Sequence, residues 1–131
     1  MALHGLEIVN KIMYNDYERH YMDELLFTAE YTSEALEQLS ELNDAEYLKI
    51  TKAIYIFERV GKKYKNINDL GNGLFELKPD NVRAYFKYAK NKIIIVGLIV
   101  LKKTQKAPAR FIKQAHLNID KYLQENKELL Q

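Results

Sequence analysis

The sequence predicts a small α+β domain in which helices pack on a twisted antiparallel sheet. Apolar residues at helical spacing dominate the first half, and three consecutive segments of strand character follow in the second half. The connections between those segments are of hairpin length, and such short connections join antiparallel neighbours. At 131 residues, with 47% hydrophobic residues and no internal repeat or flexible linker, the chain (1–131) is expected to be one domain.

The first half predicts a helix, a short strand and two further helices. Helical spacing of apolar side chains covers about 6–21, and residues 25–31 have the character of a short strand. Side chains of the Thr32-Ser33 pair and of the Asn43-Asp44 pair are suited to cap the next two helices. Gly61 is expected to end the second of these, because glycine adopts the left-handed conformation found there.

The second half predicts three strands and a final helix. A turn is expected at the Gly71-Asn72-Gly73 segment, with strands over 74–78, 82–88 and 93–101. The last strand is an unbroken apolar run, which is typical of a central strand covered on both faces. Pro108 then stands where the first turn of a helix tolerates proline.

Charge is segregated along the chain. Residues 1–61 hold five Lys or Arg and twelve Asp or Glu, whereas residues 62–131 hold fifteen and six. Between positions 81 and 119 there is no acidic residue, and the nine cations there are Arg83, Lys87, Lys90, Lys92, Lys102, Lys103, Lys106, Arg110 and Lys113. Because like charges repel, this region favours an anionic partner, and nucleic acid is the first candidate.

Two arrangements within this region suit RNA. Alternation along a strand places Arg83, Tyr85 and Lys87 on one face, where cations would neutralise phosphates and the ring would stack on a base. The alternative is a solvated outer face of the sheet. The Lys102-Lys103-Thr104-Gln105-Lys106 segment joins the apolar strand to the last helix, so its cations and the free N–H groups of that helix converge on one spot. A solvated loop is the alternative here.

Other features of the sequence bear on cofactors, on individual residues and on the compartment. The chain has no cysteine, and its three histidines form no metal-binding spacing, so neither a metal nor another cofactor is expected. His116 borders the apolar stripe of the last helix, which favours a structural role, and Glu76 is expected to pair with a cation. The longest apolar run has nine residues, too few to span a bilayer, and the first residues lack the pattern of a signal peptide. A cytoplasmic protein is expected.

Three segments resemble the RelE/HigB superfamily of type II toxin–antitoxin toxins, in particular its phage-derived HigB-like branch. They are the G-L-F-E-L-K strand at 73–78, the strand with Arg83 among aromatic residues, and the apolar strand that runs into K-K-T-Q-K-A-P at 102–108. The resemblance implies a RelE-like core over 24–123. Residues 1–22 have no counterpart and are expected to form an added helix that covers a sheet edge or joins a homo-oligomer.

The resemblance implies a metal-independent endoribonuclease that cleaves mRNA, usually on the translating ribosome, and that a cognate antitoxin restrains. Arg83 matches the strand arginine that faces the scissile phosphate, and Lys102 and Lys103 match the paired lysines of the family. Tyr85 completes the expected catalytic set. The other cations expected to bind RNA are Lys78, Lys87, Lys106, Arg110 and Lys113. Proton transfer is left open among Tyr85, a lysine of the pair and His116.

Two other functions stay open, one because the same fold supports toxins that poison gyrase, and one because this chain departs from the family pattern. Lys78 stands where arginine is more frequent, Leu98 replaces a frequent histidine, and Val100 replaces an aromatic residue. Lysine lacks the bidentate fork that arginine offers a phosphate. The first alternative is a ParE-like toxin that poisons gyrase, and the second is an inert domain that binds RNA or antitoxin.

Overall fold

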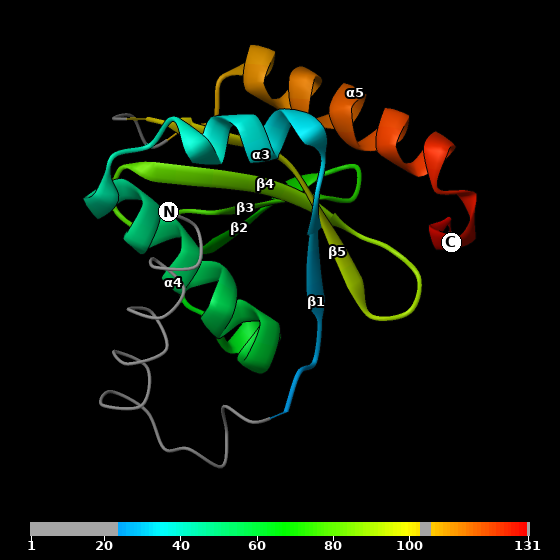
Figure 1. Cartoon of the computed structure of the whole chain (residues 1–131), viewed down its shortest axis with the longest axis horizontal. Coiled ribbons are helices and arrows are strands. Elements are labelled where there is room, and N and C mark those ends of the chain that lie inside the picture. The colour runs from blue at the N-terminus through cyan, green and yellow to red at the C-terminus, as the bar shows by residue number, and fades with distance from the viewer. Residues whose placement is uncertain (1–23, 103–105, 131) are drawn as a thin grey trace.

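The computed structural model describes residues 24–102 and 106–130, and these form a sheet with helices on both faces (Figure 1). The elements are β1 (Thr28–Tyr31), α3 (Ser33–Ser40), α4 (Asp44–Val60), the 3₁₀ turn η1 (Gly61–Lys63), β2 (Ile67–Gly71), β3 (Leu74–Leu77), β4 (Val82–Tyr88), β5 (Ile93–Leu101), α5 (Ala109–Glu125) and the 3₁₀ turn η2 (Lys127–Leu129). The predicted α+β class is confirmed. The helix expected within 1–22 lies outside the described residues.

The sheet has the strand order β1-β5-β4-β3-β2. Strands β2 to β5 form an antiparallel meander, and its last three strands, β3 to β5, are those that the hairpin-length connections predict. The sheet is mixed and not wholly antiparallel, because β1 runs parallel to β5 at one edge. Between β1 and β5 the chain passes through two helices and three strands, which is more than the length that a parallel pairing requires.

Strand β2 was not predicted from the sequence. Its residues Ile67–Gly71 include asparagine, aspartate and glycine, which strands generally disfavour. Pairing with β3 holds it in the sheet, with a register shift between Asp69 and Gly71. The turn that follows is the predicted one, and Gly71, Asn72 and Gly73 all have positive φ.

The helix ends follow the predicted signals. Thr32 Oγ1 accepts a hydrogen bond from Ala35 N at 3.1 Å, and Asn43 forms a capping box with Glu46. Gly61, at φ 58°, ends α4. Each end therefore satisfies backbone groups that the helix alone leaves without a partner.

Two apolar cores lie on opposite faces of the sheet. Helices α3 and α4 cover one face, where Phe57 packs on Phe86 with ring centroids 5.0 Å apart. Helix α5 covers the other face, where Ala115 and Ile119 are fully buried. Figure 1 shows α5 lying along the sheet on the side away from α4. Strand β5 is covered on both faces, as the apolar run at 93–101 predicts. Strand β4 is covered on both faces too, so Arg83 and Tyr85 do not lie on the solvated outer face that was the alternative for them.

A β-bulge in β5 shifts the alternation of its side chains. Tyr85 pairs with Leu98 and Phe86 pairs with Val96, so Gly97 is the extra residue. Before the bulge, Ile93 and Ile95 face α5, and after it the even-numbered residues do. A one-residue shift moves every later side chain to the opposite face of the sheet.

The bulge is also where both helix layers attach to the sheet. The carbonyl oxygen of Gly97 accepts hydrogen bonds from Thr32 Oγ1 at 3.3 Å and from Asn118 Nδ2 at 2.8 Å. A Cβ at Gly97 would lie 2.4 Å from Cγ1 of Ile119, closer than packed atoms can be. Glycine therefore permits the close approach of α5 to β5.

Replacing Gly97 with alanine is expected to lower the free energy of unfolding by about 1–3 kcal/mol, because the added methyl group must push Ile119 away from the sheet. Urea denaturation of wild type and variant measures this loss. Combined with Ile119→Ala, the substitution should cost less than the sum of the two single changes. A Gly97→Ala protein as stable as the wild type would contradict the close packing described here.

Candidate functional site

A group of charged and polar side chains lies buried on the α5 face of the sheet, around Glu76 of β3. Oε2 of Glu76 lies 3.6 Å from Lys102 Nζ and 3.7 Å from Arg83 Nε, and Oε1 accepts a hydrogen bond from Asn68 Nδ2 at 3.1 Å. Glu76 is fully buried, and Arg83 and Lys102 are each 5% exposed. With Tyr85, these residues are called the Glu76 cluster below.

The sheet brings the members of the Glu76 cluster together. Asn68, Glu76 and Tyr85 stand opposite one another on β2, β3 and β4, so they form one row across the sheet. Arg83 lies two residues before Tyr85 and shares its face, as the alternation in β4 predicts. Lys102 directly follows β5, and its backbone N–H donates to Asn81 O at 2.8 Å.

Arg83 is held against the turn between β3 and β4. Its Nη1 donates to the carbonyl oxygens of Asp80 and Val82 at 2.5 and 3.1 Å. Its Nε is buried and makes no hydrogen bond among the described residues. The guanidinium therefore has a fixed position, and its Nε is a buried donor still to be used.

Tyr85 is buried and not presented to solvent. Its ring packs edge-on against Phe111 of α5, with ring centroids 6.4 Å apart. Burial, and then the charge of Glu76, raise the pKa of Tyr85 well above its ordinary value, so the hydroxyl stays protonated at neutral pH. The buried ring cannot stack on a base in this conformation.

The structure brings together three of the four side chains expected to be catalytic, and Lys103 lies outside the described residues. The expected pairing of Glu76 with a cation is confirmed, and the carboxylate pairs with two. Asn68 was missed because β2 was missed. Its position opposite Glu76 becomes visible only once the strand pairing is known.

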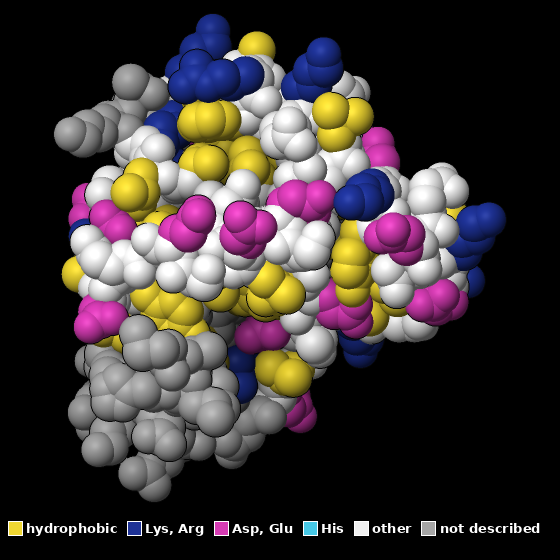
Figure 2. Space-filling model, turned by 45° about the horizontal axis from the view of Figure 1, so that its top comes forward, with side chains coloured by type: hydrophobic (Ala, Val, Ile, Leu, Met, Phe, Trp, Pro, Cys, Tyr) yellow, Lys and Arg dark blue, Asp and Glu magenta, His cyan; other side chains and the backbone are white. Residues whose placement is uncertain are grey.

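The cations expected to bind RNA do not form one group. Lys106, Arg110 and Lys113 are exposed at and just before the first turns of α5. Figure 2 shows Lys and Arg side chains gathered at the top of the molecule, on the side of α5. Lys78 is half-buried just after β3, and Lys87 pairs with Asp120 at 3.3 Å, farther along α5.

His116 lies near the Lys87–Asp120 pair. Burial, and then the positive charge of Lys87, lower the pKa of His116 from its ordinary value, so the ring is neutral at pH 7. His116 is half-buried on α5, and the structural role expected for it stays a prediction.

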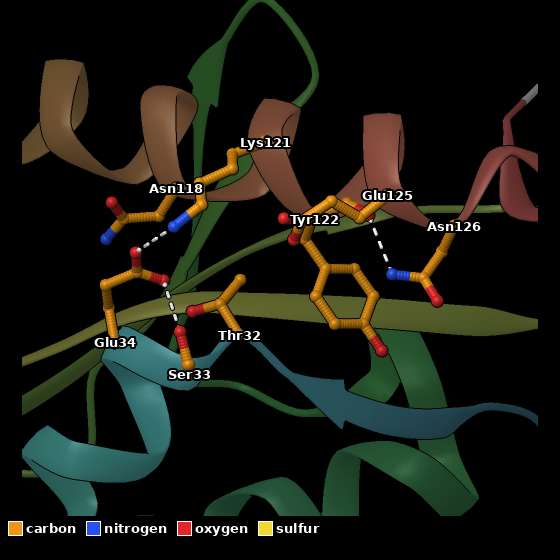
Figure 3. A pocket seen from close by; sticks show the side chains of 8 residues that line it. All are labelled: Thr32, Ser33, Glu34, Asn118, Lys121, Tyr122, Glu125 and Asn126. Atoms are coloured by element: carbon orange, nitrogen blue, oxygen red, sulfur yellow. Dashed lines mark hydrogen bonds and ion pairs between the residues drawn. The ribbon is translucent and has the colours of Figure 1, made fainter.

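A polar pocket separates the start of α3 from the second half of α5 (Figure 3). Lys121 and Glu34 meet across it at 3.5 Å, and Tyr122 Oη donates to Glu30 Oε1 at 2.5 Å. The pocket contains none of the predicted site residues. Within 24–102 and 106–130, no group of three His, Cys, Asp or Glu side chains could hold a metal ion.

Among the described helices, none combines the length and the apolarity that crossing a bilayer requires.

Comparison with known proteins gives one family and one fold. The family model described as "Phage derived protein Gp49-like (DUF891)" matches residues 37–119. A chain from the crystal structure of the archaeal RelE–RelB complex of Pyrococcus horikoshii OT3 matches with a TM-score of 0.51 and 17% sequence identity. The match covers 62% of this chain and 100% of the archaeal one. No curated protein matches.

Replacing Tyr122 with phenylalanine is expected to lower the free energy of unfolding at pH 7 by about 1–3 kcal/mol, because the hydroxyl donates to the Glu30 carboxylate. This bond, and then burial, raise the pKa of Tyr122 from 10.0 to about 12. The folded state thus holds this proton more tightly than the unfolded state, so the contribution is complete below pH 10 and is lost as the pH rises toward 12.

Urea denaturation between pH 7 and pH 11 measures both the loss of stability in Tyr122→Phe at pH 7 and the change of this loss with pH. The difference in stability between the wild type and Tyr122→Phe should shrink above pH 10, and the other tyrosines cancel in that difference. A difference that stays constant up to pH 11 would show that the hydroxyl is not bound to Glu30 as described.

Proposed function

Because the chain belongs to the Gp49-like family of phage-derived proteins and has a RelE-like fold, we propose that it is the toxin of a type II toxin–antitoxin pair. Its reaction is metal-independent cleavage of mRNA, with the ribosome as the site of action and the cytoplasm as the compartment. The observation that carries this proposal is the meeting of Arg83 and Lys102 at one point of the sheet, next to the start of α5.

The proposed reaction is attack of a ribose 2′-hydroxyl on the adjacent phosphorus. The 2′-oxygen forms a bond to phosphorus, the bond from phosphorus to the 5′-oxygen breaks, and the phosphoryl oxygens gain negative charge in the transition state. Cations held in place stabilise that charge more than the charge of the ground state. Arg83 and Lys102 supply this charge, and Lys103 is the third candidate.

The chain has several groups for the two proton transfers. Arginine does not release its proton, so Arg83 acts as a fixed charge only. Tyr85 keeps its proton at neutral pH, which suits a donor to the leaving 5′-oxygen and not a base for the 2′-hydroxyl. With Lys102 acting as a cation, Lys103 and His116 are the remaining candidates for the base.

The RNA backbone is proposed to cross the first turns of α5 on its way to the Glu76 cluster. Lys106, Arg110 and Lys113 supply exposed charge there. Tyr85 of the cluster touches Phe111 in the first turn of α5, so this exposed charge and the cluster adjoin. Lys87 is left out of this path, since Asp120 neutralises it.

The proposed protein partner is a cognate antitoxin. The matched archaeal chain comes from a complex with RelB, and a cationic face that is harmful when free is suited to an acidic or amphipathic segment of a partner. A homo-oligomer through residues 1–22 remains part of the proposal.

Arg83→Gln and Lys102→Met are each expected to lower the rate of RNA cleavage by roughly 10²–10³, the cost of removing one donor from an oxyanion hole. Growth of an induced bacterial host, with primer extension on abundant mRNAs, measures toxicity and cleavage together. Arg59→Gln is the matched control, because Arg59 is a half-buried arginine that lies over Tyr55 on the opposite face of the sheet. Circular dichroism checks that every variant folds.

The same experiment separates the alternatives. Growth arrest with cut mRNA, lost in both variants and kept in the control, supports the proposal. Arrest without cuts points to a ParE-like action, which a supercoiling assay with gyrase then tests. A wild-type protein that neither arrests growth nor cuts RNA would leave an inert binding domain.

Arg110→Gln with Lys113→Gln is expected to weaken RNA binding and reduce its dependence on salt. Each lost phosphate contact should make the slope of log K against log[salt] less steep by about 0.7 for a single strand. Fluorescence anisotropy with a labelled RNA at several salt concentrations measures the slope. Lys62→Gln with Lys63→Gln is the control, as these exposed lysines lie at the end of α4. Equal slopes for both double variants would place the RNA elsewhere.

A further inference from the structure

The two cations proposed to bind the scissile phosphate already face an anion, the carboxylate of Glu76. Lys102 and Arg83 both approach the same oxygen, Oε2, at 3.6 and 3.7 Å. The separation between Lys102 Nζ and Arg83 Nε therefore cannot exceed the sum of these two distances. Both cations are only 5% exposed, and the Glu76 carboxylate already occupies a position beside both of them that an anion would take.

The carboxylate holds these cations loosely. Separations of 3.6 and 3.7 Å give attraction between charges but exceed the usual length of a hydrogen bond. Oε2 of Glu76 and Nε of Arg83 are both buried without a hydrogen bond among the described residues. Unsatisfied polar atoms in a buried site are costly, so their occurrence on facing groups calls for a functional explanation.

The balance of charge also favours a further anion. Arg83, Lys102 and Glu76 together carry one net positive charge, and a net positive charge attracts a further anion. A phosphodiester oxygen could approach Arg83 Nε at normal hydrogen-bond length, because a mobile ligand is not restricted by the backbone of β3.

We propose that the Glu76 carboxylate is a built-in substitute for the substrate phosphate, which neutralises Arg83 and Lys102 in the free protein and is displaced when the phosphate binds. The carboxylate turns toward the edge strand β2, where Asn68 is half-buried and already binds Oε1. That the arriving anion belongs to RNA rests on the function proposed above. The exchange of the Glu76 carboxylate for another anion does not depend on that proposed function.

The test uses inorganic phosphate as the probe and thermal unfolding as the readout, with ionic strength held constant by sodium chloride. Glu76→Gln keeps the shape of the side chain and removes its charge, so it should lower the Tm by more than about 5 °C without phosphate. Phosphate should then raise the Tm of this variant by several degrees more than that of the wild type, since the probe replaces the missing carboxylate.

Glu58→Gln is the matched control. Glu58 is half-buried on the other face of the sheet, accepts a hydrogen bond from Ala29 N at 2.8 Å, and has Arg59 at 3.8 Å. The Glu58→Gln variant loses one negative charge, as Glu76→Gln does, but Glu58 does not lie between Arg83 and Lys102. Phosphate should stabilise it no more than it stabilises the wild type. Equal gains from phosphate in Glu76→Gln, Glu58→Gln and the wild type would overturn the proposal.

A second variant keeps the test decisive where Glu76→Gln folds poorly. Folding of Glu76→Gln only in the presence of phosphate supports the exchange. Should it fail to fold in either buffer, Glu76→Asp decides, because it withdraws the carboxylate by one methylene group while keeping its charge. A gain from phosphate larger than that of the wild type supports the proposal, and an equal gain overturns it.

RNA binding separates this inference from the proposed function. An RNA with a 2′-deoxy residue at the cut should bind Glu76→Gln roughly tenfold more tightly than wild type, because the internal competitor is gone. Weaker binding would contradict the exchange. If phosphate stabilises the variant as expected while the wild type cleaves no RNA, then the anion site stands and the proposed reaction fails.

Discussion

One extra residue in β5 determines which face of the sheet receives Lys102. Up to Val96 the odd-numbered residues of β5 face α5, and beyond the bulge at Gly97 the even-numbered ones do. Without the extra residue, Lys102 would point toward α3 and α4, on the side of the sheet opposite Arg83 and Glu76. The same glycine, having no side chain, lets α5 lie close enough to cover Tyr85. Both the site and its cover therefore depend on the geometry at this position.

The Glu76 cluster is costly for the fold. Taking three charges out of water is unfavourable, and attraction at 3.6 and 3.7 Å repays that cost less well than hydrogen-bonded pairs would. Apolar side chains of similar size would fill the same space on the α5 face without that cost. Keeping a carboxylate there is therefore easier to explain by what the two cations do when an anion arrives than by the stability of the free protein.

Most of the fold could be predicted because its signals are local. Capping residues at Thr32 and Asn43 and the apolar run at 93–101 each act on their own segment, and the structure has those elements where they were expected. Strand β2 could not be predicted, since only its pairing with β3 offsets its unfavourable composition. The bulge at Gly97 could not be predicted, because an all-apolar strand has no alternation of polar and apolar residues that a bulge would interrupt. A glycine inside a strand was the one available sign of a bulge.

The distribution of charge explains why the site lies at the start of α5. The acidic first half of the chain supplies Glu30 and Glu34, which bind the second half of α5 through Tyr122 and Lys121. Asp120 neutralises Lys87 in the same region. For Arg110 and Lys113, near the beginning of the helix, no ion pair is found within the described residues. Repulsion among cations is thus relieved along most of α5 and persists beside the Glu76 cluster, where an incoming phosphate would relieve it.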